Sequence, residues 1–118
     1  MKKKTFCFDI DNTICKTVGS NYSKSVPKKK VIKLINKLYT EGNTIKILSA
    51  RYMGRNKDNI KKANKQGYKK TYNQLRSWNL KFHKLFITKP ASDYYIDDKS
   101  VFFKKNWVSI FNKKYFKK

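Results

Sequence analysis

The acidic side chains of this chain are few and unevenly placed. Its 118 residues include 7 Asp and Glu against 30 Lys and Arg, which gives a net charge of +23. Four of the seven acids form two close pairs, Asp9 with Asp11 and Asp97 with Asp98, and each pair follows an apolar run. Clustered carboxylates repel one another unless a cation or a proton lies among them. In so basic a chain, this clustering indicates a chemical role.

The first pair suits phosphoryl chemistry. Mg²⁺ prefers oxygen ligands and binds through one or two carboxylates together with waters and substrate phosphate. A carboxylate can also attack phosphorus and form an aspartyl-phosphate. We expect Asp9 to be this nucleophile and Asp11 to protonate the leaving oxygen and then activate water. Asp97 would join the metal site from another strand.

Two further side chains are candidates for holding the phosphate. A transferring phosphoryl group needs positive charge and hydrogen-bond donors around its other oxygens. Ser49 follows the second apolar run that is predicted to be a strand, and Lys89 follows the third. We expect both at the same edge of the sheet as the acids.

Short apolar runs predict the strands that position these residues. Four strands are expected, at 5–10, 44–48, 84–87 and 94–96, each short and apolar enough to be buried on both faces of a parallel sheet. Cys7, within the first run, is therefore expected to be a small buried hydrophobe. Residues 12–26 are polar and are expected to form a loop.

Helical spacing of apolar residues predicts the remaining elements. One helix is expected from Pro27 to the residue before Gly42, since Pro is favoured in a first turn and Gly after a last one. The segment 57–79 is predicted to be one long helix, kinked near Gly67, or two shorter helices. The aromatic-rich stretch 101–116 fits either a short helix or a final strand.

Alternating strands and helices indicate a single α/β domain over residues 1–118, with a basic tail at about 113–118. Right-handed crossovers place helices on both faces of such a sheet, which predicts three α/β/α layers, Rossmann-like, around a mostly parallel sheet. Ligands of these folds bind at the carboxyl ends of the strands, where both acidic pairs fall.

The charge of the chain favours anionic partners, although its composition offers a simpler explanation. A charge of +23 should attract polyanions. The basic residues are nearly all Lys, however, with three Arg only, and abundant Asn, Ile and Tyr suggest a compositional bias. Arg would be favoured for bidentate phosphate or base recognition. Nucleic acid is thus a less favoured partner than a small phosphorylated metabolite.

Two classes of protein are disfavoured by the sequence. Two Cys and one His without metal-like spacing argue against a zinc site. The apolar stretch behind the basic N-terminus is broken at Asp9, so we expect no secretory or membrane-spanning segment and a cytoplasmic location.

The ordered motifs resemble those of the haloacid dehalogenase superfamily of aspartate-nucleophile phosphatases. Asp9-Ile10-Asp11-Asn12-Thr13 is similar to its first motif, Ser49 to its second, Lys89 to its third and Asp97-Asp98 to its fourth. The resemblance covers residues 5–98. An acid at the position of Asp11 is typical of the phosphatase branches.

The resemblance implies roles for single residues. Asp9 would be nucleophile and metal ligand, Asp11 acid/base and a metal ligand through its carbonyl, and Thr13 a support for their loop. Asp97 and Asp98 would complete the Mg²⁺ site. Ser49, Ala50 and Lys89 would bind the substrate phosphate, with Lys84 as the alternative lysine.

Specificity in this superfamily is commonly set by inserted cap domains, and this chain has no interval long enough for a sizeable one. The resemblance therefore implies an open site, or one covered by a second subunit. The stretches around Ser49 and Asp97 are most similar to small phosphatases of capsule or lipopolysaccharide sugar biosynthesis. Candidates for contacting the leaving group are Arg51, Arg55, Asn21, Tyr22 and Lys24.

Three functions remain open from the sequence. The first is a Mg²⁺-dependent phosphatase of a sugar phosphate or a related small metabolite. The second is a 5′-nucleotidase or a phosphatase of nucleic-acid ends, which the short interval between Lys89 and Asp97 and the basic charge favour. The third is a non-catalytic polyanion-binding module, against which Asp11 and Lys89 argue, because a binding module needs no general acid.

Overall fold

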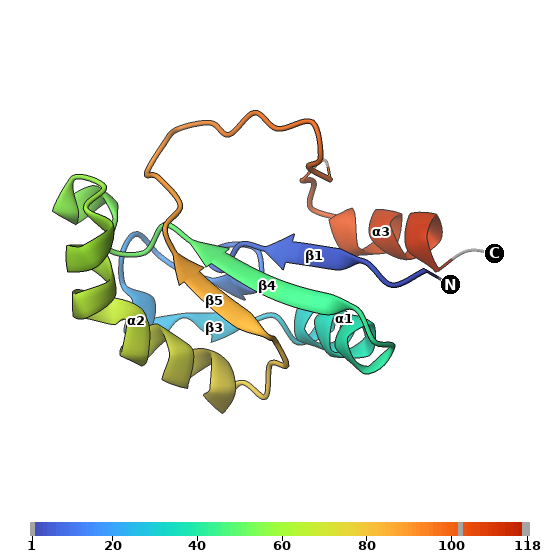
Figure 1. Cartoon of the computed structure of the whole chain (residues 1–118). Helices are drawn as coiled ribbons and strands as arrows, with labels where there is room; N and C mark the ends of the chain where they lie inside the picture. The colour runs from blue at the N-terminus through green and yellow to red at the C-terminus, as the bar shows by residue number, and fades with distance from the viewer. Residues whose placement is uncertain (1, 102, 117–118) are drawn as a thin grey trace.

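Three parallel strands form the sheet that carries the candidate site. The computed structural model describes residues 2–101 and 103–116. The strands are β1 (Thr5–Phe8), β4 (Thr44–Ser49) and β5 (Lys84–Ile87), in the order β1-β4-β5, so β4 is central (Figure 1). Phe8 lies level with Ile47, and Ile47 level with Leu85. The predicted strands at 5–10, 44–48 and 84–87 are confirmed, with β1 ending earlier, at Phe8.

The predicted strand at 94–96 is wrong. The described residues from 88 to 106 contain no helix or strand and arch from the end of β5 to the last helix (Figure 1). A parallel strand beside β1 needs a crossover of about a dozen residues or more. Only residues 88–93 separate β5 from this segment, and β4 and β1 lie in between.

The long helices agree with the apolar spacing. α1 spans Lys29–Thr40 and buries an apolar stripe against the sheet, and α2 spans Ile60–Ser77 as one helix. The Asn59 side chain caps α2 by accepting a hydrogen bond from the Lys62 amide. The stretch predicted as helix or strand forms α3 (Trp107–Tyr115). Residues 117 and 118 of the expected basic tail lie outside the described residues.

The expected loop at 12–26 contains a small ribbon, and Pro27 does not open a helix. β2 (Cys15–Lys16) pairs antiparallel with β3 (Val26–Pro27), and the 3₁₀ turn η1 (Tyr22–Lys24) lies between them. The amide of the next residue, Lys28, donates to the Ile14 carbonyl at 2.8 Å, which holds the chain extended until α1 begins. A two-stranded edge tolerates Pro because its missing N–H can face away from the partner strand.

Burial alternates along the sheet, so its two faces differ. The side chains on one face are buried or half-buried and join the core with all three helices: Phe6, Phe8, Ile45, Ile47, Leu85 and Ile87. On the other face, Cys7 and Lys84 are exposed and Lys46, Leu48 and Phe86 are half-buried. Among the described residues no helix covers that face, which differs from the expected three layers.

Cys7 is therefore exposed, contrary to its expected burial, whereas Cys15 is buried. The error arises because an apolar run alone does not show that only one face of its strand is covered. Among residues 2–101 and 103–116, no helix has both the length and the apolar character needed to cross a bilayer.

Gly67 lets α2 approach the loop after β4 closely. A Cβ built on Gly67 would lie 1.9 Å from the Tyr52 ring. The ring of Tyr52 also packs edge-on against Tyr22, with 5.0 Å between centroids. A glycine that costs helix stability is thus retained where a ring occupies the space of its side chain.

Gly67→Ala should destabilise the fold by about 1–3 kcal/mol, because the added methyl overlaps the Tyr52 ring. In a Tyr52→Ala background the same change should instead stabilise by about 0.5–1 kcal/mol, since Ala is the better helix former. Urea unfolding of the four proteins measures both effects. Equal effects in the two backgrounds would contradict the contact.

Candidate active site

The carboxyl edge of the sheet gathers three of the predicted site residues. Asp9 follows β1 directly, Ser49 ends β4, and Lys89 lies two residues beyond β5. The Lys89 amide donates to the Ser49 carbonyl at 3.2 Å, which extends the pairing of β4 and β5 to this edge. Lys84, the alternative lysine, begins β5 and so lies at the opposite end of the strand.

Asp9 presents a half-exposed carboxylate. Its Oδ1 accepts a hydrogen bond from the Ile10 amide at 2.9 Å, and its Oδ2 lies 3.6 Å from Lys89 Nζ. Burial raises the pKa of Asp9, and the nearby Asp11 carboxylate adds to this, whereas Lys89 and the Ile10 amide lower the pKa. The Asp9 side chain is 37% exposed, so an incoming phosphate can reach it.

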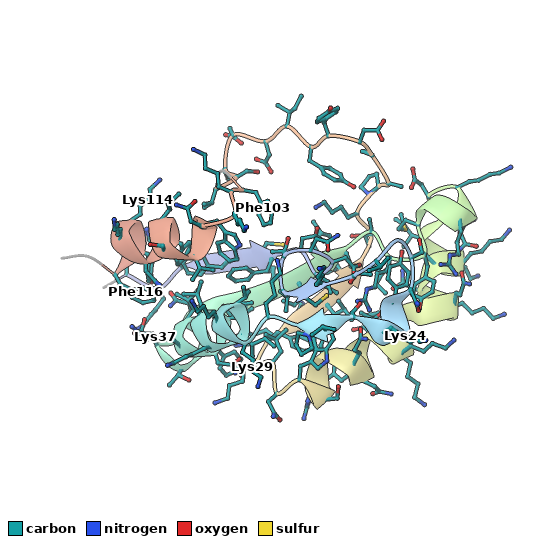
Figure 2. All side chains as sticks on the ribbon, turned by 180° about the vertical axis from the view of Figure 1, so that it is seen from behind. Lys24, Lys29, Lys37, Phe103, Lys114 and Phe116 are labelled. Atoms are coloured by element: carbon teal, nitrogen blue, oxygen red, sulfur yellow. The ribbon has the colours of Figure 1, made fainter. Side chains whose placement is uncertain are left out.

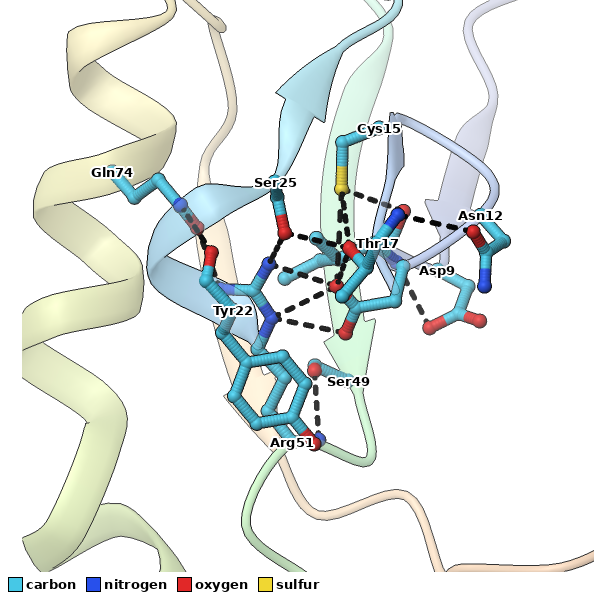
Figure 3. Close-up of polar contacts among 11 residues, drawn as sticks. Asp9, Asn12, Cys15, Thr17, Tyr22, Ser25, Ser49, Arg51 and Gln74 are labelled. Carbon is cyan, nitrogen blue, oxygen red and sulfur yellow. Dashed lines mark hydrogen bonds and ion pairs between the residues drawn. The ribbon is translucent and has the colours of Figure 1, made fainter. Parts of the chain in front are cut away.

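A tight turn follows β1 and carries Asp11. The amides of Thr13 and Ile14 donate to the Ile10 carbonyl at 3.0 and 2.8 Å, and Asn12 adopts a positive φ of 61°. Asn is among the residues that tolerate this conformation best. Figure 3 shows Asp9 on one side of this turn and the cluster around Arg51 on the other.

Asp11 forms a bidentate ion pair with Arg51. Arg51 Nε lies 2.9 Å from Asp11 Oδ2, and Arg51 Nη2 lies 2.8 Å from Asp11 Oδ1. Thr17 Oγ1 donates to the same Oδ1 at 2.6 Å. The Arg51 side chain is 2% exposed, so this pair is largely shielded from water.

The remaining donors of Arg51 reach two other parts of the fold. Nη1 donates to Gln74 Oε1 on α2 at 2.6 Å, and Nη2 contacts Ser25 Oγ next to β3 at 3.4 Å (Figure 3). Gln74 in turn donates to the Tyr22 carbonyl at 2.7 Å. Thr17, Ser25 and Gln74 were not predicted. Each is an ordinary polar residue in its own stretch of sequence, with no local signal of these contacts.

Arg51 is thus a partner of Asp11, whereas the sequence suggested a contact to the leaving group. Arg55 is exposed, and its guanidinium lies 4.9 Å from the Tyr52 ring and 5.8 Å from the Tyr22 ring. Tyr22 and Arg51 also line an open pocket of about 420 Å³ against α2. Asn21 and Lys24 are exposed beside Tyr22.

Ser49 and Ala50 shape the loop after β4. Ser49 Oγ is fully buried and accepts a hydrogen bond from the Arg51 amide at 3.0 Å. The Ala50 carbonyl accepts from the Met53 amide at 3.0 Å, which closes a turn. Ser49 therefore orders the segment that places Arg51 beside Asp11.

Asp97 and Asp98 are not brought to the other acids. Both are exposed in the arched segment, and Asp97 Oδ1 accepts a hydrogen bond from the Lys99 amide at 2.8 Å. Within the described ranges, no three His, Cys, Asp or Glu residues group so that they could hold a metal ion. Asp11 is paired with Arg51, so among the described residues at this edge of the sheet Asp9 is the available carboxylate. This donor set does not fit a complete Mg²⁺ site.

The two carboxylates should have opposite effects on stability. Burial raises the folded-state pKa of Asp9, so ionisation of Asp9 costs stability above that pKa, and the cost shrinks as the pH falls through it and is gone below the lower pKa of the unfolded chain. Asp9→Asn should therefore be more stable than wild type at neutral pH and equal at acid pH. Asp11→Asn should lose about 3 kcal/mol, because it leaves the Arg51 charge buried without its partner.

Urea unfolding at neutral and acid pH measures both changes. A loss of stability in Asp9→Asn at neutral pH, or an unaffected Asp11→Asn, would contradict this assignment of the two environments.

Comparison with known proteins supports the fold. No family model matches the chain, and no curated protein matches it. A crystal structure of a target protein from Vibrio cholerae superposes with a TM-score of 0.78 at 22% identity, over 94% of this chain and 98% of that one. At this identity the likeness extends to the α/β fold alone.

Proposed function

We propose that this protein is a phosphomonoesterase that works through an aspartyl-phosphate on Asp9. The observation that carries the proposal is the convergence of Asp9, Ser49 and Lys89 at one sheet edge, with Asp9 the accessible carboxylate. The motif resemblance supports the same reading. The finer fold assignment, to the haloacid dehalogenase type, belongs to this proposal.

The first step transfers the phosphoryl group to the protein. An Asp9 carboxylate oxygen attacks phosphorus, the bond to the ester oxygen breaks, and Asp11 gives that oxygen a proton. Lys89, which lies 3.6 Å from Asp9 Oδ2, offsets negative charge on the phosphoryl oxygens. For this step Asp11 must leave Arg51 and take up a proton from solvent, which it then gives to the leaving oxygen.

The second step regenerates Asp9. Water attacks phosphorus and gives its proton to Asp11, the bond between phosphorus and Asp9 breaks, and inorganic phosphate leaves. Asp11 then releases this proton to solvent and pairs with Arg51 again. In this reading Arg51 is a positioning residue, which differs from the leaving-group contact that the sequence suggested.

The substrate class we propose is a sugar phosphate or a related small metabolite. The pocket of about 420 Å³ beside Tyr22 combines aromatic rings with the polar groups of Asn73, Gln74 and Lys70. A polyol or sugar has hydroxyls for such donors and acceptors. Exposed Arg55 can contact further anionic groups of the substrate.

Phosphate release should depend on Asp9. With Mg²⁺ added, as the resemblance implies, we expect wild type to release phosphate from one or more sugar phosphates and Asp9→Asn to release none. Glu41→Gln, an exposed acid at the end of α1, is the matched control and should keep full activity. The panel should include nucleotides and 3′- and 5′-phosphorylated oligonucleotides.

Undiminished release by Asp9→Asn would rule out the nucleophile. Preference for oligonucleotides, with turnover falling steeply as salt rises, would favour the nucleic-acid alternative. Absence of turnover on the whole panel would favour the binding module.

Lys89 should set the acid limb of the pH profile. Asp9 must be ionised to attack, so kcat/KM falls as the pH drops through its pKa. Lys89 lowers that pKa against the raising effect of burial. Lys89→Met should therefore move the acid limb to higher pH and reduce the rate about 10²-fold or more. Lys84→Met, at the other end of β5, should leave the limb in place. An unmoved limb in Lys89→Met would contradict the pairing.

A further inference from the structure

The edge of the sheet next to Asp9 is the outer side of β1. β1 pairs with β4 on one side and, within the described residues, with no strand on the other. An unpaired edge presents backbone N–H and C=O groups that can accept another strand. Asp9 stands at the carboxyl end of this edge.

One apolar segment of the same chain lacks a place in the core. Ile96 is 99% exposed and Tyr94 86% exposed, next to Asp97 and Asp98. Phe103 and Ile110 at the far end of the arch and on α3 are exposed as well. Figure 2 shows Phe103 where the arched segment meets α3. An apolar run this exposed is typical of an interaction site.

Pairing with that edge within its own chain would need an unusually short crossover. β5 and β1 lie on opposite sides of β4, so a strand outside β1 would lie about 14 Å from β5, at roughly 4.8 Å for each strand spacing. Residues 88–93 would also have to return to the amino end of the sheet. Parallel connections take about a dozen residues or more.

We propose that residues 94–96 of one chain add as a fourth parallel strand to the free edge of β1 in a second copy, carrying Asp97 to the Asp9 of that copy. By symmetry the second copy returns its own segment, which gives a closed dimer. The completion of the catalytic site rests on the proposed function, whereas the strand exchange does not.

The side-chain pattern fits this addition. The register that places Asp97 level with Asp9 places Ile96 level with Phe8 and Tyr94 level with Phe6. Phe6 and Phe8 face the helices, and Phe8 packs near Trp107 of α3. The two most exposed apolar side chains of the arch would therefore enter the core, and Tyr95 would face the open side beside Cys7.

The same arrangement accounts for the incomplete acid set. One chain holds Asp9 at the edge and carries Asp97 and Asp98 in the exposed arch. In the dimer, carboxylates from two chains meet at each edge, which is the oxygen donor set that suits Mg²⁺. The basic surface also favours the approach of an acidic pair.

Thiol capture tests the strand exchange directly. In Tyr95→Cys, mild oxidation should link residue 95 of one chain to Cys7 of the other, because neighbouring strands place their Cα atoms within disulfide range. Tyr94→Cys is the matched control: Tyr94 is more exposed than Tyr95, yet the register turns it away from Cys7. A second control, Tyr95→Cys with Cys7→Ser, should not link. Cys15 is buried, so we expect it to form no disulfide in this experiment.

Non-reducing gels detect the covalent link between chains, and sedimentation at physiological salt gives the oligomeric state. A dimer in solution, with covalent linkage in Tyr95→Cys alone, supports the proposal. A monomer, an intrachain disulfide, no linkage, or equal linkage in both single variants would overturn it.

Complementation tests the shared site. Asp9→Asn and Asp97→Asn should each be inactive alone. Their heterodimer, co-expressed with two tags and purified through both, contains one intact site of two and should recover about half of the wild-type rate. Recovery of none, with wild type active, would overturn the exchange of Asp97. If wild type itself is inactive, the proposed function fails and thiol capture still decides the exchange.

Discussion

The ion pair between Arg51 and Asp11 is the contact on which the arrangement of the edge depends. It joins the turn after β1 to the loop after β4, and through Thr17, Ser25 and Gln74 it also reaches the β2–β3 ribbon and α2. A guanidinium in this position uses its planar fork fully, which Lys could not do. Because Arg51 is buried, movement of any one of these segments would deprive its charge of a partner.

This pair also divides two nearby acids into different environments. Asp11 is neutralised by a buried cation, whereas Asp9 meets only the end of a lysine at 3.6 Å and remains open to solvent. Two carboxylates separated by a single residue thus differ in what they can do. Asp11 must leave Arg51 before it can transfer a proton, whereas Asp9 can bond directly to an incoming group. The partners make the division, because Arg51 holds both oxygens of Asp11 whereas Lys89 approaches one oxygen of Asp9.

Much of the fold could be predicted, because its signals are local. Apolar runs identified β1, β4 and β5, helical spacing identified α2, and the rule for parallel sheets placed Asp9, Ser49 and Lys89 at one edge. The Arg51–Asp11 pair escaped prediction because its members lie 40 residues apart and either could have faced solvent. The exposure of Cys7 escaped it because burial of the second sheet face depends on layers that no single run encodes. The segment 94–96 has the composition of a strand but pairs with no strand among the described residues.

The order of elements along the chain has a consequence for biosynthesis. α3 comes last among the helices and strands, and its Trp107 and Phe111 pack against Phe8 and Phe6 of the first strand. Domains generally fold as units. A nascent chain that lacks α3 therefore leaves the aromatic side chains of β1 uncovered beside an edge that no described strand pairs with, a combination that favours association with other chains. Synthesis of the last helix thus removes an aggregation-prone surface that the first strand creates.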